Sequence, residues 1–215
     1  IIGGGISGCS VAYHLSLLGW REIVLLERRQ LTCGTTWHAA GLIGQLRATE
    51  NLTRLARYSA ELYHSLEAET GLATGIRRNG SITVALTADR MEEVRRQAAL
   101  ARAFGVEVHE IGVSDIRDRY PHLNTSGVVG GVFLPGDGQC DPGNVAMALA
   151  KGARQRDAQI FENTKVAGID LNDGRVAGVR WQRHDESGIT EGRIATDVVI
   201  NCAGMWAREL AAGVG

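Results

Sequence analysis

A glycine-rich turn at the start of the chain limits the possible folds more than any other feature of the sequence. The turn reads Gly3-x-Gly5-x-x-Gly8, follows two apolar residues and opens a segment whose apolar residues recur at helical spacing. That segment ends at Gly19, and the apolar run at 23–26 then predicts a short buried strand. A strand, a glycine turn, a helix and a second strand in this order indicate an α/β fold with a parallel sheet.

The same order of parts is the dinucleotide-binding fingerprint of a Rossmann-type domain, in which each glycine has its own role. Gly3 permits the tight turn, Gly5 lets the backbone approach a pyrophosphate, and Gly8 allows the helix to pack closely on the strand. The pyrophosphate would lie on the first N–H groups of the helix, at Ile6 and Ser7, where the helix dipole favours negative charge. The alternative is a glycine-rich turn that binds no ligand.

An acidic residue follows the second strand of this unit. Glu27 lies about 20 residues after the turn, the usual distance for a carboxylate that binds ribose hydroxyls, and Arg28 is expected beside it. Arg28 and Arg29 could instead bind a 2′-phosphate, as in NADP, but the carboxylate of Glu27 would repel that phosphate. A third interpretation places both arginines in a solvated loop.

The composition is that of a globular chain. Its 215 residues are 44% hydrophobic and 22% charged, which is enough for a buried core in one or two domains. A net charge of -1 argues against a nucleic acid or an anionic membrane bound by bulk electrostatics, and no apolar run reaches the roughly 18 residues of a membrane span. Four cysteines without CxxC spacing indicate reduced thiols, as in a bacterial cytoplasm or the mitochondrial matrix.

The two ends of the chain suggest a fold that is truncated at both ends. The chain begins without Met and keeps two residues, Ile1 and Ile2, of a strand that usually has about five. The middle of the chain mixes strands and helices without a βαβ rhythm, which indicates a second domain inserted into the first. We therefore expect a first segment of the dinucleotide-binding domain at 1–75, part of an inserted domain at 76–140, and a second, incomplete segment at 141–215.

Spacing and capping signals predict the remaining elements. A stripe of leucines at a period near 3.6 (Leu52, Leu55, Leu62, Leu66) predicts a helix over 50–70. Asp141 and Pro142 are expected to cap and start a helix that runs to about 156, and the turn at 172–174 predicts a hairpin. Further helices are expected at 88–104 and 114–120. Strands are expected at 80–86, 106–109, 128–134, 160–162, 165–171, 175–181, 189–195 and 197–201, the last of them apolar and fully buried.

A segment of small residues follows the two arginines. It reads Gly34-Thr35-Thr36-Trp37-His38-Ala39-Ala40-Gly41-Leu42. Its composition fits a backbone pressed closely against a flat ligand, with the two threonines offering hydroxyl and N–H groups. Trp37 would either shield such a ligand or simply pack, and a lone histidine such as His38 is often a structural residue.

Three stretches together resemble the FAD-dependent amine oxidoreductases of the D-amino-acid-oxidase family, and most closely their sarcosine and dimethylglycine dehydrogenase branch. They are the turn at 3–8 with Glu27, the segment 34–42, and the stretch Asn201-Cys202-Ala203-Gly204-Met205-Trp206-Ala207-Arg208. The resemblance extends over the whole chain, although the enzymes of that family are much longer. It implies a Rossmann-type FAD-binding domain of the GR2-like, three-layer kind with an inserted α+β substrate domain.

The resemblance also implies roles for single residues. His38 takes the position of the histidine that bonds covalently to the flavin 8α-methyl group, and Val166 the position that holds adenine through its backbone. Ala203 and Gly204 would bring backbone close to the dinucleotide, with Trp206 nearby; ordinary strand pairing and a plain strand-to-helix turn are the alternatives at these positions. No catalytic side chain and no metal ligand is assigned. The expected cofactor site comprises Gly3, Gly5, Ile6, Ser7, Gly8, Glu27, Arg28, Gly34, Thr35, Thr36, Trp37, His38, Ala39, Ala40, Gly41, Leu42, Val166, Ala203, Gly204 and Trp206.

The reaction implied by the resemblance is oxidation of the N-methyl group of sarcosine or dimethylglycine, by hydride transfer to flavin N5. Water or tetrahydrofolate would capture the iminium product, and an electron-transfer flavoprotein or O2 would accept the electrons. One alternative is another amine or 2-hydroxy-acid flavoenzyme of the same superfamily. The other is an FAD-binding fragment or subunit without catalytic activity.

Overall fold

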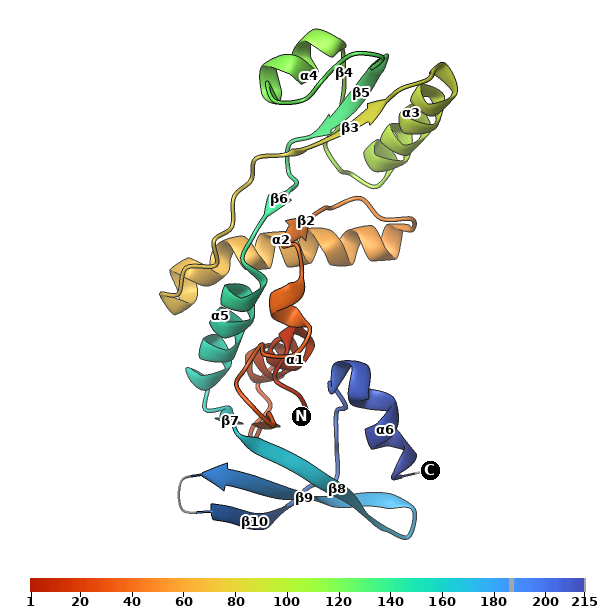
Figure 1. Ribbon diagram of the computed structural model, residues 1–215. Helices are drawn as coiled ribbons and strands as arrows, with labels where there is room; N and C mark the ends of the chain where they lie inside the picture. The colour runs from red at the N-terminus through yellow and green to blue at the C-terminus, as the bar shows by residue number, and fades with distance from the viewer. Residues whose placement is uncertain (186–187, 215) are drawn as a thin grey trace. The chain divides into compact units, whose positions relative to one another are not determined.

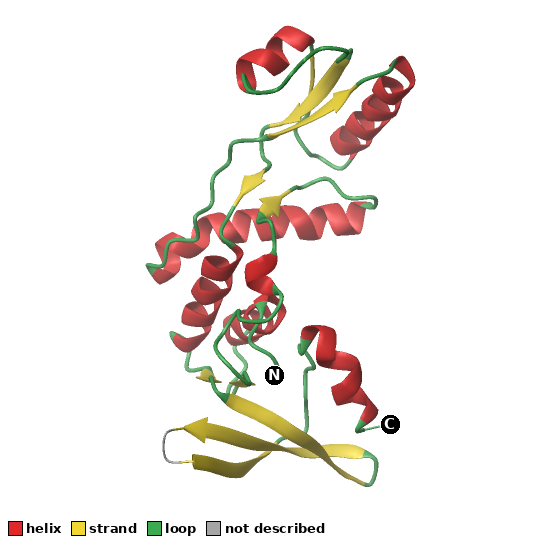
Figure 2. Ribbon diagram, in the orientation of Figure 1, coloured by secondary structure: helices red, strands yellow, loops and turns green. Residues whose placement is uncertain are grey.

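The computed structural model describes residues 1–185 and 188–214, and it shows a mixed α/β chain (Figures 1 and 2). The chain divides into two compact units. The first unit combines Ile1–Ala40, Leu66–Thr74 and the residues from Asp141 onward, and the second combines Gly41–Ser65 with Gly75–Cys140. Within the described residues, no helix has both the length and the apolar character that crossing a bilayer requires. The assignment of the segments 1–75, 76–140 and 141–215 to FAD-binding and substrate domains stays a prediction.

The first unit is built around short parallel strands. Strand β1 (Val24–Leu26) pairs in parallel with β7 (Gln159–Phe161). On the other side of β1, Ile2 forms parallel bridges to both Leu26 and Asn201. Helix α1 (Ile6–Leu17) connects Ile2 to β1, so the order glycine turn, helix, strand is confirmed, and the residue before the turn pairs in parallel as a single bridge.

Two helices of the first unit pack against each other through small residues. Helix α5 (Pro142–Arg154) begins as predicted, because the Asp141 side chain accepts a hydrogen bond from the Asn144 N–H and Pro142 is the first helical residue. Its buried face consists mostly of alanines, with one glycine. A Cβ on Gly152 would lie 2.8 Å from the Tyr13 ring of α1, so the two helices approach more closely than an alanine there would allow.

A three-stranded antiparallel sheet completes the strands of the first unit and contributes to the site (Figure 1). It consists of β8 (Thr164–Asn172), β9 (Arg175–Asp185) and β10 (Gly188–Ala195). The hairpin predicted at 172–174 is confirmed, and Asp173 and Gly174 both have positive φ, as a two-residue hairpin turn requires. Ala167 falls outside the regular register, because Val166 pairs with Trp181 and Gly168 with Arg180.

The expectation of a fully buried strand at 197–201 is wrong. Val198 is 59% exposed, and the segment makes only one bridge, from Asn201 to Ile2. Its backbone bonds on that side are the Ile2 N–H to the Ile200 oxygen at 2.9 Å and the Cys202 N–H to the Ile2 oxygen at 2.8 Å. An extended segment needs a ladder of such bonds to form a strand, and one bridging residue does not supply it.

The second unit contains an antiparallel sheet with a helix against each face. The strand order is β3 (Ser81–Ala85), β5 (Gly130–Leu134) and β4 (His109–Ile111). Alternate residues of β5 separate the two faces, as the period of a strand requires. Val132 and Leu134 pack with helix α3 (Ala88–Ala103), whereas Phe133 packs with the cluster that includes Ile116 of α4 (Val113–Arg119).

A buried carboxylate, that of Asp137, joins the segment before the long helix of the second unit to its antiparallel sheet. Helix α2 (Glu50–Thr70) begins here, β2 (Leu42–Ile43) pairs with β6 (Gly138–Gln139), and Asp137 is only 5% exposed. Asp137 accepts hydrogen bonds from the Gln45 N–H at 2.8 Å and from the Ser81 hydroxyl at 2.7 Å. These bonds fix the segment before α2 to β3.

The range of α2 is as predicted, but the leucine stripe on it is partly wrong. Leu66 is fully buried, whereas Leu52 and Leu55 are 51% and 61% exposed. The buried residues of the first half of α2 are Thr53 and Ala60. Hydrophobic spacing therefore located the helix without locating its buried face in the first turns.

Candidate functional site

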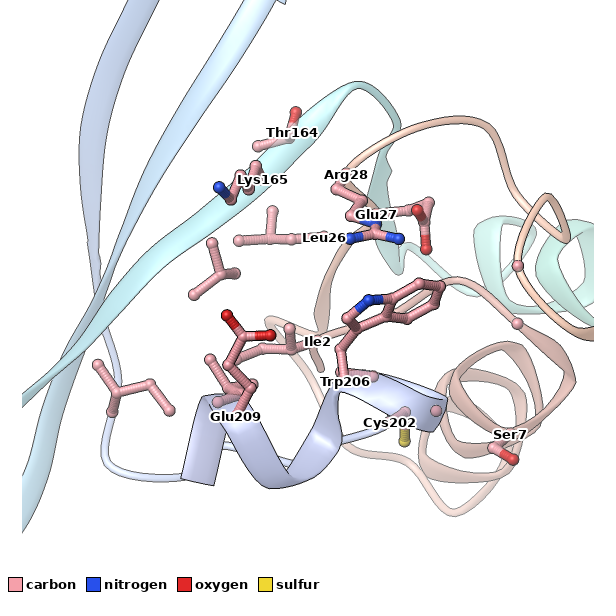
Figure 3. Close-up of a pocket in the computed structure, with 18 of the residues that line it drawn as sticks. Ile2, Ser7, Leu26, Glu27, Arg28, Thr164, Lys165, Cys202, Trp206 and Glu209 are labelled. Atoms are coloured by element: carbon pink, nitrogen blue, oxygen red, sulfur yellow. The ribbon is translucent and has the colours of Figure 1, made fainter. Parts of the chain in front are cut away.

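The first unit contains a pocket of about 540 Å³ at the glycine turn (Figure 3). Four parts of the chain form most of its wall: the turn itself, the end of β1 with the loop after it, the start of β8, and the segment that follows Asn201. Strand β9 adds Arg180. The lining residues are Ile2, Gly3, Gly5, Ile6, Ser7, Leu26, Glu27, Arg28, Cys33, Gly34, Thr35, Thr36, Thr164, Lys165, Val166, Ala167, Gly168, Ile169, Arg180, Cys202, Ala203, Gly204, Trp206, Glu209, Leu210, Gly213 and Val214.

The glycines of the turn are required by close backbone contacts. Gly3 has φ +107°, and a Cβ there would lie 2.4 Å from the Cys202 carbonyl oxygen. A Cβ on Gly8 would lie 1.8 Å from the Gly3 carbonyl oxygen. No larger residue fits at either position without a shift of the backbone, so the turn can be this tight only with glycine.

The start of α1 faces the pocket and suits an anion. Gly5, Ile6 and Ser7 line the pocket, and α1 has no side-chain cap and no acidic residue in its first turn. The Ile6 N–H donates to the buried Thr36 hydroxyl at 3.0 Å, which fixes the short helix η1 (Thr36–His38) next to the turn. N–H groups at a helix start, together with the helix dipole, favour a phosphate or diphosphate.

Glu27 presents its carboxylate at the end of β1. One oxygen accepts the Gly4 N–H at 2.7 Å, and the other accepts the Arg29 N–H at 3.0 Å. These bonds hold the side chain in one orientation at the pocket wall. Each carboxylate oxygen keeps further acceptor capacity, which suits ligand hydroxyl groups such as those of a ribose.

The start of β8 forms a second wall of the pocket. The Thr164 N–H donates to the Glu27 carbonyl oxygen at 2.8 Å, so β8 begins directly beside the end of β1. Residues 164–169 all line the pocket, Val166 among them. Because Ala167 lies outside the strand register, the backbone of this wall departs from regular pairing at this point.

The third wall follows Asn201 and comprises η2 (Gly204–Trp206) and helix α6 (Ala207–Ala212). The Asn201 side chain holds the turn, because its amide donates to the Ala207 oxygen at 2.8 Å and its oxygen accepts the Ala203 N–H at 3.2 Å. Figure 3 shows Arg28 over the indole ring of Trp206, with the guanidinium carbon 3.8 Å from the ring centroid.

Two of the thiols near the pocket, Cys9 and Cys202, are packing groups. Burial raises the pKa of the Cys9 thiol to about 12, and the Cys9 sulfur lies 3.6 Å from the Gly4 carbonyl oxygen. Burial also raises the pKa of Cys202, which lines the pocket. Both side chains are therefore protonated near neutral pH, and neither is a ready nucleophile.

The structure brings thirteen of the expected cofactor residues to the pocket wall and leaves seven outside it. Gly8 is one of the seven, because it packs beneath the turn. Trp37 and His38 are exposed, and their rings lie 3.8 Å apart between centroids at an interplanar angle of 33°. The other four residues outside the pocket wall are Ala39, Ala40, Gly41 and Leu42. A cofactor contact at these residues stays a prediction.

Several pocket residues were not predicted from the sequence. Lys165 and residues 167–169 line the pocket because they share a strand with Val166, so their nearness to Val166 in sequence was an available signal, whereas strand alternation would have placed only every second residue there. Glu209 and Leu210 follow Trp206 by one turn of helix, so helical spacing from Trp206 could also have predicted them. Arg180 lines the pocket because β9 pairs with β8. No local sequence pattern predicts this long-range pairing.

The pocket residues fit FAD by their chemistry. The glycine turn admits no Cβ where a diphosphate would approach, the start of α1 offers N–H groups, and Glu27 offers acceptors for ribose hydroxyls. The walls formed by β8 and η2 add backbone groups and an aromatic side chain to the same pocket. These are binding groups for a dinucleotide.

Known proteins are similar to this chain over nearly all of its length. Residues 1–215 match the model of a family described as FAD dependent oxidoreductase (DAO). Human mitochondrial sarcosine dehydrogenase is 41% identical over 213 residues, covering 96% of this chain and 22% of that enzyme. The mouse mitochondrial pyruvate dehydrogenase phosphatase regulatory subunit is 39% identical over 210 residues, covering 98% of this chain and 23% of the subunit. Rat mitochondrial dimethylglycine dehydrogenase is 37% identical over 216 residues, covering all of this chain and 24% of the enzyme.

A solved structure shows the same fold. The crystal structure of L-proline dehydrogenase from P. horikoshii is 27% identical, with a TM-score of 0.88 that covers 100% of this chain and 54% of that one. The chain thus spans about a quarter of the curated relatives and about half of this solved chain. The expected mixed α/β fold is confirmed. The family match over the full length of the sequence, together with the glycine cradle and its acidic partner, shows that this chain belongs to the FAD-dependent oxidoreductases of the DAO family.

Proposed function

We propose that this chain forms the FAD-binding part of an enzyme that oxidises the N-methyl group of a small N-methylated amino acid, sarcosine or dimethylglycine. The observation behind the proposal is the glycine cradle with Glu27 in a chain about 40% identical to relatives with those names. Dye reduction with each substrate in turn distinguishes sarcosine from dimethylglycine.

The residues of the pocket have separate tasks in this proposal. The first turn of α1 binds the diphosphate, Glu27 accepts hydrogen bonds from the ribose, and the start of β8 with Val166 holds the adenine through its backbone. FAD, when bound, supplies the hydride acceptor for oxidation of the N-methyl carbon. Water or tetrahydrofolate would capture the oxidised product, and an electron-transfer flavoprotein or O2 would accept the electrons. The protein would act in a bacterial cytoplasm or in the mitochondrial matrix.

His38 is the proposed attachment point for the flavin. The imidazole is exposed and lies against the Trp37 ring, so it is accessible to a covalent bond and limited in its orientation. In this proposal the segment from Gly34 to Leu42 lies along the flavin ring, with its small residues allowing close approach.

Acid precipitation tests the attachment. We expect the denatured full-length protein to keep yellow fluorescence in the pellet, and the His38→Ala variant to release its flavin to the supernatant. His64→Ala is the matched control, because His64 is an exposed histidine of α2, and it should keep the flavin in the pellet. A native protein that is yellow but whose flavin leaves with the supernatant would show that His38 is not the attachment point.

Dye reduction tests the substrate class. Sarcosine, dimethylglycine and glycerol 3-phosphate are offered in turn to the full-length protein, and reduction is expected with one or both of the N-methyl amino acids. Reduction by glycerol 3-phosphate alone would contradict the proposed substrate class.

A second candidate function is a flavin-binding subunit without catalytic activity. It is favoured by one relative, the mouse regulatory subunit, which is nearly as similar as the dehydrogenases. A full-length protein that binds FAD but reduces no dye with any of the amines would support this candidate.

A further inference from the structure

Arg28 makes an aromatic contact inside the pocket (Figure 3). Its guanidinium carbon is 3.8 Å from the centroid of the Trp206 ring, well within the roughly 6 Å over which a cation is attracted to an aromatic face. Among the described residues, Arg28 has no ion pair with a carboxylate. Its neighbour Glu27 is already held by the N–H groups of Gly4 and Arg29. The stack on Trp206 is therefore the contact that places the Arg28 side chain.

The stack joins two parts of the pocket wall that are distant in sequence. Arg28 follows β1, whereas Trp206 closes η2 and precedes α6, whose Glu209 and Leu210 line the pocket. Neither η2 nor α6 contains a buried residue. A segment without buried residues is held weakly by packing, so the side-chain contacts that remain, those of Asn201 and of Arg28, have a large share in fixing it.

The shape of Arg28 matters as well as its charge. A planar guanidinium can lie flat on an indole, which a lysine ammonium cannot do in the same way. On the other side of this wall, a Cβ on Gly34 would lie 3.9 Å from the edge of the Trp206 ring, an ordinary contact. The indole is thus bounded by the Gly34 loop and covered by Arg28.

We propose that Arg28 is a positioning residue that acts through Trp206. By stacking on the indole it holds the segment η2–α6 as a wall of the dinucleotide pocket beside Glu27, and it does not bind a phosphate of the ligand. The proposal rests on the proposed function only in taking FAD as the ligand of the pocket.

A double-mutant cycle on the full-length protein tests this role. The background is His38→Ala, so that the flavin exchanges freely, and the apoprotein is titrated with FAD, with ADP and with adenosine. The variants are Arg28→Gln, Trp206→Leu and the double variant. Arg29→Gln is the matched control, because Arg29 is an exposed neighbour outside the pocket wall.

The expected pattern is the same loss for all three ligands. Each single variant should weaken binding about 2- to 5-fold, in line with a cation–π contact made by an exposed arginine. The double variant should lose little more than either single variant, because the two residues act as one contact. Trp206→Phe, which keeps an aromatic face under Arg28, should lose less than Trp206→Leu, and Arg29→Gln should bind like the parent. Hydrogen exchange at 204–212 should become faster in Arg28→Gln.

Two results would overturn the proposal by itself. Independent losses from the two single variants would show that Arg28 and Trp206 do not act together. A loss with FAD and ADP but not with adenosine would show that Arg28 binds the phosphates directly. A parent protein that binds neither FAD nor ADP would overturn the proposed function along with this inference.

Discussion

At the scale of a single residue, Gly8 leaves almost no room for a side chain. A methyl group there would lie 1.8 Å from the Gly3 carbonyl oxygen, a backbone atom that moves only if the whole turn moves. We expect Gly8→Ala to lower the free energy of unfolding by about 3 kcal/mol, the upper part of the usual range for overpacking. Flavin content after purification should fall with it, because the displaced turn is the diphosphate cradle.

Gly34→Ala is the control for this substitution. A Cβ at Gly34 meets only the edge of the Trp206 ring, at 3.9 Å, and the backbone is not left-handed. Urea denaturation should show a free energy of unfolding equal to that of the parent or up to about 1 kcal/mol higher, since alanine restricts the unfolded chain. Equal stability of the Gly8 and Gly34 variants would contradict the close contact at Gly8.

At the scale of the elements, one carboxylate connects the helices behind the site. Glu69, in the last turn of α2, accepts the Tyr13 hydroxyl of α1 and the Arg156 guanidinium after α5, each at 2.7 Å. Partial burial raises the pKa of Glu69, but the hydrogen bonds from Tyr13 and Arg156 and the charge of Arg156 outweigh it, so the pKa is lowered. The folded protein therefore favours the ionised form of the Glu69 side chain over its protonated form.

The lowered pKa of Glu69 predicts how the loss of stability in Glu69→Gln changes with pH. A lowered pKa in the folded state means that the stabilisation is complete above the unfolded value of about 4.3 and is lost as the pH falls through the folded value. At pH 7 the variant should be about 1.5 kcal/mol less stable than the parent, as expected for a hydrogen bond to a charged group. Denaturant curves at pH 7 and pH 3 should show that this difference shrinks in acid. Glu67→Gln, on an exposed neighbour in the same helix, should show no difference at either pH.

The elements also show how much of the fold and of the site could be predicted from the sequence. Helix starts such as Asp141-Pro142 and the hairpin at 172–174 were predicted because capping and turn chemistry are local. The segment 197–201 was not, because its apolar composition says nothing about which strands are present to pair with it. In the pocket, Glu27 was placed by spacing from the turn, whereas Arg180 depends on the register between two strands.

At the scale of the whole molecule, the first unit has a second pocket, which is largely apolar. It has a volume of about 560 Å³, and its lining includes Trp20, Ile23, Val179 and Val198. Trp20 is 58% exposed and Val198 59% exposed, so a hydrophobic dye can reach this surface. We expect the 215-residue chain to bind anilinonaphthalene sulfonate and to be poorly soluble, and we expect Trp20→Ser with Val198→Thr to reduce the dye fluorescence at least twofold.

Trp37→Ser is the control for the dye experiment. Trp37 is exposed to the same degree, at 59%, but it does not line the second pocket. Its substitution should leave the dye fluorescence nearly unchanged. An equal decrease in both variants would show that the dye binds scattered surface residues and not this pocket.

The parallel pairing of β1 with β7 also has a consequence for biosynthesis. Val24 finds its partner at Gln159, so the nascent N-terminal region leaves the ribosome long before the strand that completes its sheet. Until then, Glu27 lacks its backbone partner Thr164, and the glycine turn lacks Cys202 beside Gly3. Contacts between residues so far apart in the sequence form slowly. Until they form, the incomplete sheet has an unpaired edge. We therefore expect the nascent chain to depend on chaperones during translation, before it meets the flavin.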